Sequence, residues 1–254
     1  MTAVPESHPR YASLKLRDAI VAGVEQGVTS IHGLIAHGRG EAFDYLIGET
    51  TQPFASDAIH AAAAMLLLAK SPVISVNGNA GALVPNELVA LGKLIGAPLE
   101  VNIFHTSSAR EHAIRHSLMA HGAEAVLEPT DEAEIPGLES NRRFVHPRGI
   151  FRADVVFVPL EDGDRCEALR KMGKEVVTID LNPMSRTARA ASVTIVDNVV
   201  RALPRLIEEV RALQTSPVED ATKLRASYDN NTVLAAAVRR IRTGGTSSLE
   251  QEVR

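Results

Sequence analysis

Tryptophan is absent from this chain of 254 residues, and cysteine occurs only once, as Cys166. A single cysteine excludes an internal disulfide and is typical of proteins that work in a reducing compartment. Aromatic residues make up only 4% of the chain, and the formal net charge is -4. The sequence therefore offers neither stacking platforms for nucleic acids nor a basic footprint for nucleic acids or anionic membranes.

Long apolar segments are also missing. The longest apolar run, from Ala61 to Ala69, is too short to span a bilayer and is typical of a buried helix. The segment 1–15 contains no apolar core of the length found in signal peptides. We therefore expect a cytoplasmic protein that binds neither membranes nor nucleic acids.

Two common phosphate-binding motifs are absent. No GxxxxGK[ST] loop occurs, and Gly38 and Gly40 lack the third glycine of the dinucleotide fingerprint, because Phe43 stands in its place. The two glycines instead flank Arg39, ahead of a helical segment. In a loop, their backbone amides would approach a ligand while the guanidinium pairs with phosphate oxygens. A plain turn is the alternative interpretation.

Strand and helix patterns alternate along the chain. Apolar, strand-like segments bounded by turn residues are predicted at 73–77, 99–104, 125–127, 153–160, 176–179 and 193–196. Helical patterns are predicted at 11–26, 56–70, 86–96, 108–121 and 165–173, and after Asn198. This alternation predicts an α/β fold, with a Rossmann-like doubly wound, mostly parallel sheet and helices on both faces in three layers. We expect a single domain over 1–254, with a core at about 9–213, a helical segment at 220–242 and a frayed tail at 244–254.

Polar side chains follow the last two predicted strands. The loops after the strands at 176–179 and 193–196 contain, respectively, Asp180, Asn182, Ser185, Arg186 and Thr187, and Asp197 and Asn198. Ligands of open parallel sheets bind where neighbouring strands end. These side chains can together contact the adenine, ribose and phosphates of a nucleotide, although the same residue types also form ordinary turns and N-caps.

Two further turns contain candidate ligand contacts. A glycine-rich turn between a strand and a helix that begins near Pro85 contains Asn77, Gly78 and Asn79. Such a turn holds anions on free backbone amides, or simply connects the two elements. The strand at 153–160 is followed by Glu161, Asp162 and Asp164. These carboxylates can bind Mg²⁺ or a substrate ammonium group, or cap the next helix.

The remaining polar features are less specific. The segment 128–152 contains several prolines and glycines, and a connection of this length is usually a functional lid or an oligomer contact. His112 and His116 lie one turn apart on a predicted helix, but no zinc-binding motif accompanies them. We therefore expect a solvated basic helix face there and no protein-bound metal site.

Four segments resemble the archaeal 4-phosphopantoate–β-alanine ligase family, also called phosphopantothenate synthetase. They are GLIAHGRGEAFDYLIGE at 33–49, PVISVNGNAGALVP at 72–85, VPLEDGDR at 158–165, and IDLNPMSRTA at 179–188 together with TIVDN at 194–198. The resemblance covers roughly 9–213. It implies a homodimeric enzyme that joins 4-phosphopantoate and β-alanine with ATP and Mg²⁺, releasing AMP and pyrophosphate through an acyl-adenylate.

The resemblance also implies roles for individual residues. The ATP contacts would be Arg17, Arg39, Asp180, Leu181, Asn182, Arg186, Thr187, Asp197 and Asn198. As hypotheses, Arg39 and Arg186 stabilise the pyrophosphate leaving group. The phosphate of the acid would bind at Asn77, Gly78 and Asn79, and the β-alanine ammonium at Glu161, Asp162 or Asp164.

Two other functions stay open from the sequence. A nicotinamide-dependent oxidoreductase would suit the fold, but it requires the complete glycine fingerprint. A non-catalytic adenine-nucleotide-binding protein would use the same polar loops without turnover.

Overall fold

A six-stranded sheet forms the centre of the computed structural model, which describes residues 5–8, 10–104, 107–160 and 162–244. The strands lie in the order β3-β2-β1-β6-β7-β8, with bounds Val126–Leu127, Leu99–Val101, Pro72–Val76, Val155–Pro159, Glu175–Ile179 and Val193–Ile195. Each neighbouring pair is parallel. Along the chain, the strands are added from the central β1 outward to β3, and then from the central β6 outward to β8. This doubly wound order confirms the predicted fold class.

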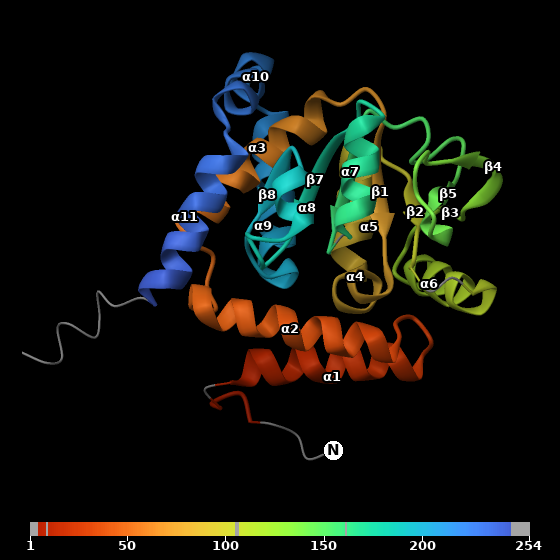
Figure 1. The fold of residues 1–254 in the computed structure, drawn as a ribbon, viewed down its shortest axis with the longest axis horizontal. Coiled ribbons are helices and arrows are strands. Elements are labelled where there is room, and N and C mark those ends of the chain that lie inside the picture. Colours follow the sequence, from red (N-terminus) through yellow and green to blue (C-terminus); the bar gives the residue numbers. More distant parts are fainter. Residues whose placement is uncertain (1–4, 9, 105–106, 161, 245–254) are drawn as a thin grey trace, which may run out of the picture.

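Helices cover both faces of this sheet (Figure 1). One face packs against α3 (Pro53–Leu68), α5 (Pro85–Ile95), α6 (Ser108–Ala120) and α9 (Val199–Gln214), and the other against α7 (Gly163–Lys171), with α8 (Arg186–Ala190) beside it. Alternate strand residues serve the two layers: Ile74 belongs to the first apolar cluster and Val73 to the second. Because both faces are covered, β6 is a continuous apolar run.

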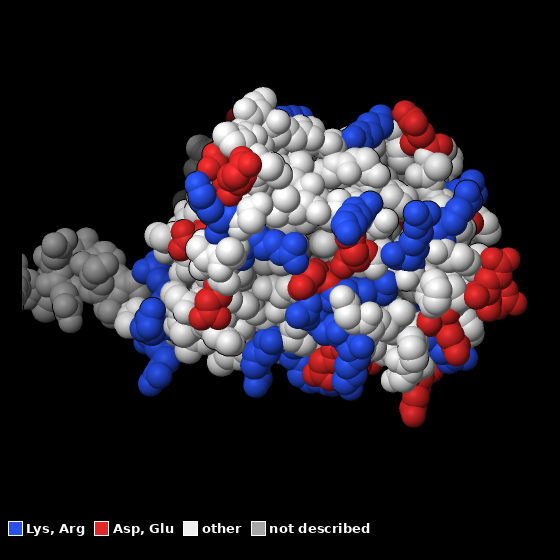
Figure 2. All heavy atoms as spheres, turned by 90° about the horizontal axis from the view of Figure 1, so that it is seen from above, with Lys and Arg blue, Asp and Glu red and all other residues white. Residues whose placement is uncertain are grey.

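Two helices follow α9 where one or two were expected. They are α10 (Val218–Ser227) and α11 (Asn230–Thr243), and both contact α3. Apart from Gly244, the predicted tail lies outside the described residues. The described ranges contain no helix with the length and apolar character of a membrane span. Lys and Arg alternate with Asp and Glu on the face shown in Figure 2, which therefore has charges of both signs.

A pair of helices, α1 (Tyr11–Glu25) and α2 (Ile31–Ile47), lies across the carboxyl ends of the strands (Figure 1). The expectation that Gly38 and Gly40 flank a loop is wrong, because both lie inside α2 and their amides belong to the helix. Among the glycines of α2, only Gly33 is required by close packing, since a Cβ atom on Gly38 would have no described atom within 4 Å. A Cβ atom on Gly40 would lie 3.5 Å from Cδ1 of Leu181, and one on Gly33 only 2.3 Å from Oδ1 of Asn79.

The connection after β1 also differs from the prediction. A short helix, α4 (Gly78–Leu83), begins directly after β1 and precedes α5. Asn77 is its N-cap residue, and its Oδ1 accepts a hydrogen bond from the backbone N–H of Ala80 at 3.0 Å. The glycine-rich turn is therefore the first turn of a helix, because an asparagine cap satisfies its amides locally.

The long segment 128–152 has structure of its own. It contains β4 (Thr130–Glu134), the 3₁₀-helix η1 (Asn141–Arg143) and β5 (Phe144–Val145), and β4 pairs antiparallel with β5. Ile135, Val145 and Ile150 are buried in the second apolar cluster, on the α7 face of the sheet. Apolar side chains thus anchor this segment to the core.

Candidate functional site

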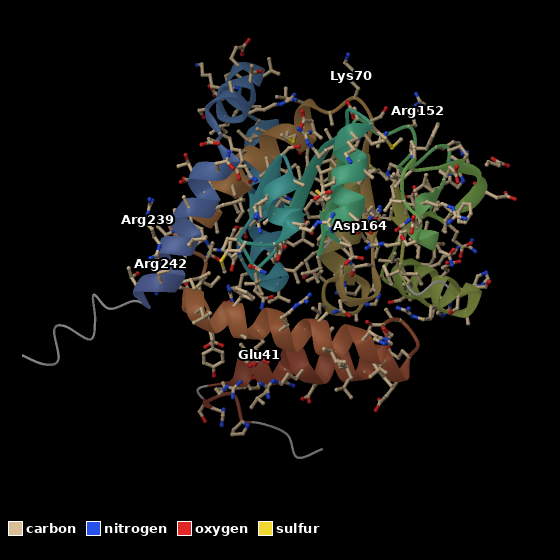
Figure 3. The ribbon with its side chains drawn as sticks, in the orientation of Figure 1. Glu41, Lys70, Arg152, Asp164, Arg239 and Arg242 are labelled. Carbon is tan, nitrogen blue, oxygen red and sulfur yellow. The ribbon has the colours of Figure 1, made fainter. Side chains whose placement is uncertain are left out.

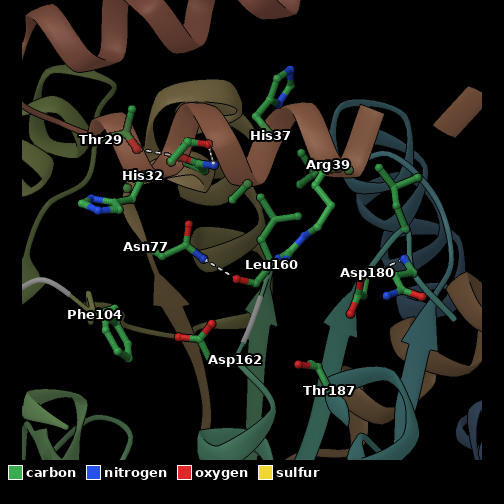
Figure 4. Close-up of a pocket in the computed structure, with 18 of the residues that line it drawn as sticks. Thr29, His32, His37, Arg39, Asn77, Phe104, Leu160, Asp162, Asp180 and Thr187 are labelled. Atoms are coloured by element: carbon green, nitrogen blue, oxygen red, sulfur yellow. Dashed lines mark hydrogen bonds between the residues drawn. The ribbon is translucent and has the colours of Figure 1, made fainter. Parts of the chain in front are cut away.

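A cavity of about 580 Å³ lies at the carboxyl ends of the strands, beneath α2 (Figure 4). Two central strands, β1 and β6, end side by side here, and their connections leave on opposite faces of the sheet. Doubly wound sheets bind ligands at this switch point. Nδ2 of Asn77 donates to the carbonyl oxygens of Pro159 and Leu160, at 2.7 and 3.0 Å. Asn77 thereby joins the two strand ends at the middle of the cavity floor.

The order of the strands gives the cavity two ends. We call one the β7–β8 end, lined by Asp180, Leu181, Asn182, Ser185, Arg186, Thr187 and Asn198, with Arg39 from α2. We call the other the β1–β2 end, lined by Asn77, Gly78, Asn79, Phe104, Arg110 and Arg142, with His32 from α2. Leu160 and Asp162, which follow β6, lie between the two ends (Figure 4).

Asp180 organises the loop of the β7–β8 end. Its carboxylate accepts hydrogen bonds from the backbone N–H of Asn182 at 2.9 Å and from the Ser185 hydroxyl at 2.5 Å. Burial raises the pKa of Asp180, while these two hydrogen bonds and the nearby guanidinium of Arg39 favour the ionised form. The same Ser185 caps α8 by accepting from the N–H of Ala188. Asp180 therefore both fixes the loop and presents an acceptor to the cavity.

Two predicted arginines lie at this end. Arg39 extends from α2 towards Leu160 and Asp180 (Figure 4), and it lines the cavity. Arg186 is exposed and forms a two-point ion pair with Glu167, at 2.9 and 3.1 Å. Because this pair is solvent-exposed, it contributes little to stability and leaves the guanidinium available for exchange to an anion.

Asp197 lies beside the cavity and does not line it. Its fully buried carboxylate accepts from Arg201 at 2.6 Å and from the hydroxyl of Thr51 at 2.6 Å. The same Arg201 pairs with Asp44, which also accepts from Nδ2 of Asn198 at 2.8 Å. Asn198 does line the cavity. The structure thus separates the two predicted residues: Asn198 faces the cavity and Asp197 holds the turn in place.

Arg17 also lies away from the main cavity. Its guanidinium pairs with Glu41 at 2.8 and 3.0 Å, on the side of α2 that faces α1 (Figure 3). Although burial alone would raise the pKa of Glu41, hydrogen bonds from Arg17 and Ser13 hold it below its ordinary value. This pair lines a neighbouring hollow of about 400 Å³, which shares Glu41 and His37 with the lining of the main cavity.

The asparagines after β1 connect α4 to neighbouring segments. Nδ2 of Asn79 donates to the carbonyl of Gly33 at 2.9 Å, and its Oδ1 accepts from the Thr29 hydroxyl at 2.5 Å. Gly78 is buried, and a Cβ atom there would lie 3.0 Å from a guanidinium nitrogen of Arg110. Asn77, Gly78 and Asn79 therefore line the cavity while most of their polar atoms serve internal contacts.

The acidic residues after β6 also differ in whether they line the cavity. Asp162 lines the cavity, is about half exposed and forms an ion pair with Arg142. Asp164 does not line the cavity, and its Oδ1 accepts from the N–H of Arg165 at 2.9 Å at the start of α7. Glu161 lies outside the described residues. Of this trio, Asp162 is the carboxylate that the described structure brings to the cavity.

Sequence reasoning missed two arginines, Arg110 of α6 and Arg142 of η1. Arg142 is only 4% exposed, and its Nε donates to Oδ1 of Asn102 at 3.0 Å. Nδ2 of Asn102 in turn donates to the carbonyls of Arg142 and Phe144, at 3.3 and 3.2 Å. No local sequence signal links these residues, because Asn102 and Arg142 are 40 residues apart.

The described residues of the cavity include no cluster of metal-ligating side chains. Among the described residues, no three His, Cys, Asp or Glu side chains are grouped so as to hold a metal ion. The cavity is instead lined by arginines at both ends, which suit phosphate and carboxylate groups. The fold and the cavity thus define a doubly wound α/β protein with a strand-end cavity that has arginines at both ends.

Comparison with known proteins makes this class specific. Residues 54–244 match the family described as phosphopantothenate/pantothenate synthetase. A Methanosarcina mazei protein named 4-phosphopantoate–β-alanine ligase is 51% identical over 95% of this chain and 95% of its own length. Proteins of the same name from Thermococcus kodakarensis and Methanospirillum hungatei are 50% and 47% identical, over 100% and 87% of this chain and 97% and 90% of their own lengths. The chain belongs to this family, which confirms the predicted resemblance.

Proposed function

We propose that this protein is a ligase of coenzyme A synthesis that joins 4-phosphopantoate and β-alanine to 4'-phosphopantothenate, converting ATP to AMP and pyrophosphate. The names of relatives that share about half of its residues support this assignment. Within the molecule, the observation that best supports this function is the two-ended cavity, which has arginines at each end and Asp162 between them. Such a cavity suits two phosphorylated substrates that react at its centre.

In this proposal, ATP occupies the β7–β8 end. The carboxylate of Asp180 and the amide of Asn182 offer hydrogen bonds to the ribose or adenine, and Leu181, Thr187 and Asn198 line the same end. Arg39 and Arg186, the latter after release from Glu167, contact the phosphates. Mg²⁺ would bind with the nucleotide, where it neutralises charge on the phosphates, and Asp162 or Asp180 would supply carboxylate oxygens.

The reaction proceeds in two steps. A carboxylate oxygen of 4-phosphopantoate attacks the α-phosphorus of ATP, and the bond from that phosphorus to pyrophosphate breaks. Arg39 and Arg186 stabilise the negative charge that grows on the leaving pyrophosphate. The amine of β-alanine then attacks the acyl carbon, and the bond to AMP breaks. Asp162 is our candidate to bind the ammonium group and accept its proton, whereas Asp164 is turned to its own helix.

Two predicted nucleotide contacts, Asp197 and Arg17, do not line the main cavity. Asp197 supports the site by fixing the turn that carries Asn198, through Arg201 and Asp44. Arg17 would contact ATP from a second subunit, because within one chain it does not line the main cavity, although its partner Glu41 does. We therefore propose a cytoplasmic homodimer. Ile31 and Ile35, which are 68% and 69% exposed on α2, are candidate contacts between subunits.

The test measures AMP and pyrophosphate release from Mg·ATP. The expected result is AMP formation that requires both 4-phosphopantoate and β-alanine and matches 4'-phosphopantothenate mole for mole. ADP and inorganic phosphate as products would contradict the adenylate route. Binding of ATP without turnover in the presence of both substrates would contradict the ligase assignment. Light scattering of the same preparation tests the dimer, which a monomeric mass would contradict.

A further inference from the structure

The C-terminal helix α11 contacts both elements that carry the proposed triphosphate-binding arginines. It packs against α8, which begins with Arg186, and against α2, which contains Arg39 (Figure 1). The proposed function, on which this inference rests, requires both guanidinium groups at one triphosphate. Because α2 and α8 are far apart in the sequence, their spacing depends on elements that contact both of them. The contacts of α11 with each of them therefore bear on nucleotide binding.

The helix α8 is too short to hold its own shape. It has only five residues, and a helix of that length is unstable unless other groups bind the free N–H and C=O groups at its ends. At its start, the hydroxyl of Ser185 accepts from the N–H of Ala188 at 2.9 Å. At its end, the carbonyls of Ala188 and Ala191 accept hydrogen bonds from Asn230, the first residue of α11. The C-terminal helix thus supplies the second cap of α8.

Asn230 uses every hydrogen-bonding position of its side-chain amide. Its Nδ2 donates to the carbonyls of Ala188 and Ala191, at 2.8 and 3.2 Å. Its Oδ1 accepts from the backbone N–H of Thr194 at 2.9 Å and from the hydroxyl of Tyr228 at 3.0 Å. These four bonds are all that an asparagine amide can form, with two donor hydrogens and two acceptor lone pairs. One side chain therefore joins the end of α8 to β8, an edge strand of the sheet.

The start of α11 is capped by a different residue. Asp229 is its N-cap, and the carboxylate accepts from the backbone N–H groups of Asn231 and Thr232, at 3.1 and 3.2 Å. The side chain of Asn230 is therefore not needed to begin its own helix. Its contacts serve α8 and β8 instead.

The opposite end of α11 holds α2. Nε of Arg240 donates to the carbonyl of Ile47, the last residue of α2, at 3.2 Å. The same carbonyl accepts from Nε2 of Gln52 at 2.8 Å. A guanidinium suits this place, because the carbonyls at a helix end lack intrahelical partners and carry partial negative charge. It also packs closely on Gly48, where a Cβ atom would lie only 2.8 Å from Nη2 of Arg240.

We infer that α11 sets the distance between Arg39 and Arg186, with Asn230 and Arg240 as positioning residues for ATP binding. Asn230 fixes α8 and hence Arg186, whereas Arg240 fixes α2 and hence Arg39. The two positioning residues belong to one continuous helix and lie about 15 Å apart along its axis. Neither of them lines the cavity, so each acts through the arginine that it positions. A displacement of about 1 Å at such a contact is enough to weaken it severely.

The test compares neighbouring residues of α11 that differ in their contacts. Asn230→Asp keeps an acceptor oxygen and removes both donor hydrogens, and Arg240→Gln removes the guanidinium. Asn231→Asp and Arg239→Gln are the matched controls, because they make the same changes of charge at exposed side chains. Arg239 points away from the body of the molecule (Figure 3). Calorimetry measures the dissociation constant of Mg·ATP, kinetics gives KM for ATP and for β-alanine, and thermal unfolding gives the melting temperature.

Asn230→Asp and Arg240→Gln should each weaken Mg·ATP binding about tenfold, the equivalent of one hydrogen bond to a charged group. KM for ATP should rise alike, and KM for β-alanine should change by less than about twofold. Arg240→Lys, which keeps a charged donor for the carbonyl of Ile47, should restore most of the affinity. A lower melting temperature with unchanged Mg·ATP binding would overturn the inference, because α11 would then only stabilise the fold. Equal losses in the test and control variants would overturn it as well.

A double-variant cycle tests whether Asn230 acts through Arg186. In an Arg186→Gln background, Asn230→Asp should weaken Mg·ATP binding by less than about twofold, because the contact that it positions is already gone. A full tenfold loss in that background would contradict the assigned role. Arg240→Gln in an Arg39→Gln background gives the same readout should Asn230→Asp fail to fold.

The two proposals fail in different ways. A wild-type protein that makes no AMP, with Mg·ATP binding that is weakened in both test variants, would refute the ligase reaction and keep the positioning role. A wild-type protein that makes AMP, with normal Mg·ATP binding in both variants, would refute the positioning role and keep the reaction.

Discussion

The two ends of the cavity are assembled in different ways. The β7–β8 end consists mainly of one loop, in which Asp180 binds the backbone of Asn182 and the side chain of Ser185. The β1–β2 end joins Asn102, Arg110 and Arg142, which come from three separate segments. Local hydrogen bonds therefore shape the first end, and tertiary packing shapes the second. This difference predicts which substitutions affect turnover and which affect the stability of the fold.

The largest effect should come from Arg39→Ala at the β7–β8 end. Loss of one preorganised cation at the leaving group typically lowers turnover by about 100- to 1,000-fold. Arg39 is exposed on α2, so the melting temperature should not change. Steady-state kinetics with both substrates saturating measures the effect. The control is Arg205→Ala, on the exposed side of α9, and equal activity in the two variants would remove Arg39 from the mechanism.

The next largest effect should come from the ion pairs of Arg201, which support the β7–β8 end. Arg201→Met should lower the free energy of unfolding by about 3 kcal/mol, because it leaves the buried carboxylates of Asp197 and Asp44 without their cation. Urea unfolding followed by circular dichroism measures the change. Arg211→Met on the same helix is the control, because Arg211 is exposed. A loss of less than about 1 kcal/mol would mean that the network is not a support.

A pH-dependent effect should appear at the opposite end. Glu100 on β2 accepts from the backbone N–H groups of His146 and Ile150, at 2.8 and 2.6 Å, and so holds the segment that carries Arg142. Burial raises the pKa of Glu100 to about 7, although these two bonds and the charge of Arg165 favour ionisation. The native state therefore keeps a proton that the unfolded chain has lost, and stability falls as the pH rises from about 4.5 to about 7.

The comparison of wild type with Glu100→Gln isolates this titration. Between pH 5 and pH 8 the wild type should lose about 2 kcal/mol more stability than the variant, whose amide does not ionise. Urea unfolding at a series of pH values measures the difference. Parallel pH profiles would show that Glu100 ionises alike in the folded and unfolded states. A wild type that gains stability relative to the variant would reverse the sign and contradict the account.

Sequence reasoning placed residues correctly where their position depends on neighbouring residues. Asp180 and Arg186 follow one strand directly, so pattern alone put them at a strand end. It failed at Gly38 and Gly40, because glycine signals a loop locally, whereas both residues lie inside α2. Local glycine content does not reveal that the helix continues through this segment.

The sequence did not predict the β1–β2 end of the cavity, for a related reason. Arg142 lies in the segment 128–152, which the sequence predicts to be a functional lid or an oligomer contact, and its direction depends on Asn102, 40 residues away. Arg17 stays a prediction. The family resemblance identifies it as a nucleotide contact, and the structure places it in an ion pair with Glu41 beside a hollow next to the main cavity. A pairing of this kind depends on how two helices pack against each other, so the sequence of either helix alone does not predict it.

The most direct test of the central claim follows one oxygen atom through the reaction. With 4-phosphopantoate labelled by ¹⁸O in its carboxylate, attack on the α-phosphorus transfers one carboxylate oxygen to the nucleotide. Mass spectrometry of the products should therefore find one ¹⁸O in AMP and one in the new amide of 4'-phosphopantothenate. Unlabelled AMP, or label in inorganic phosphate, would contradict an acyl-adenylate formed at the centre of this cavity.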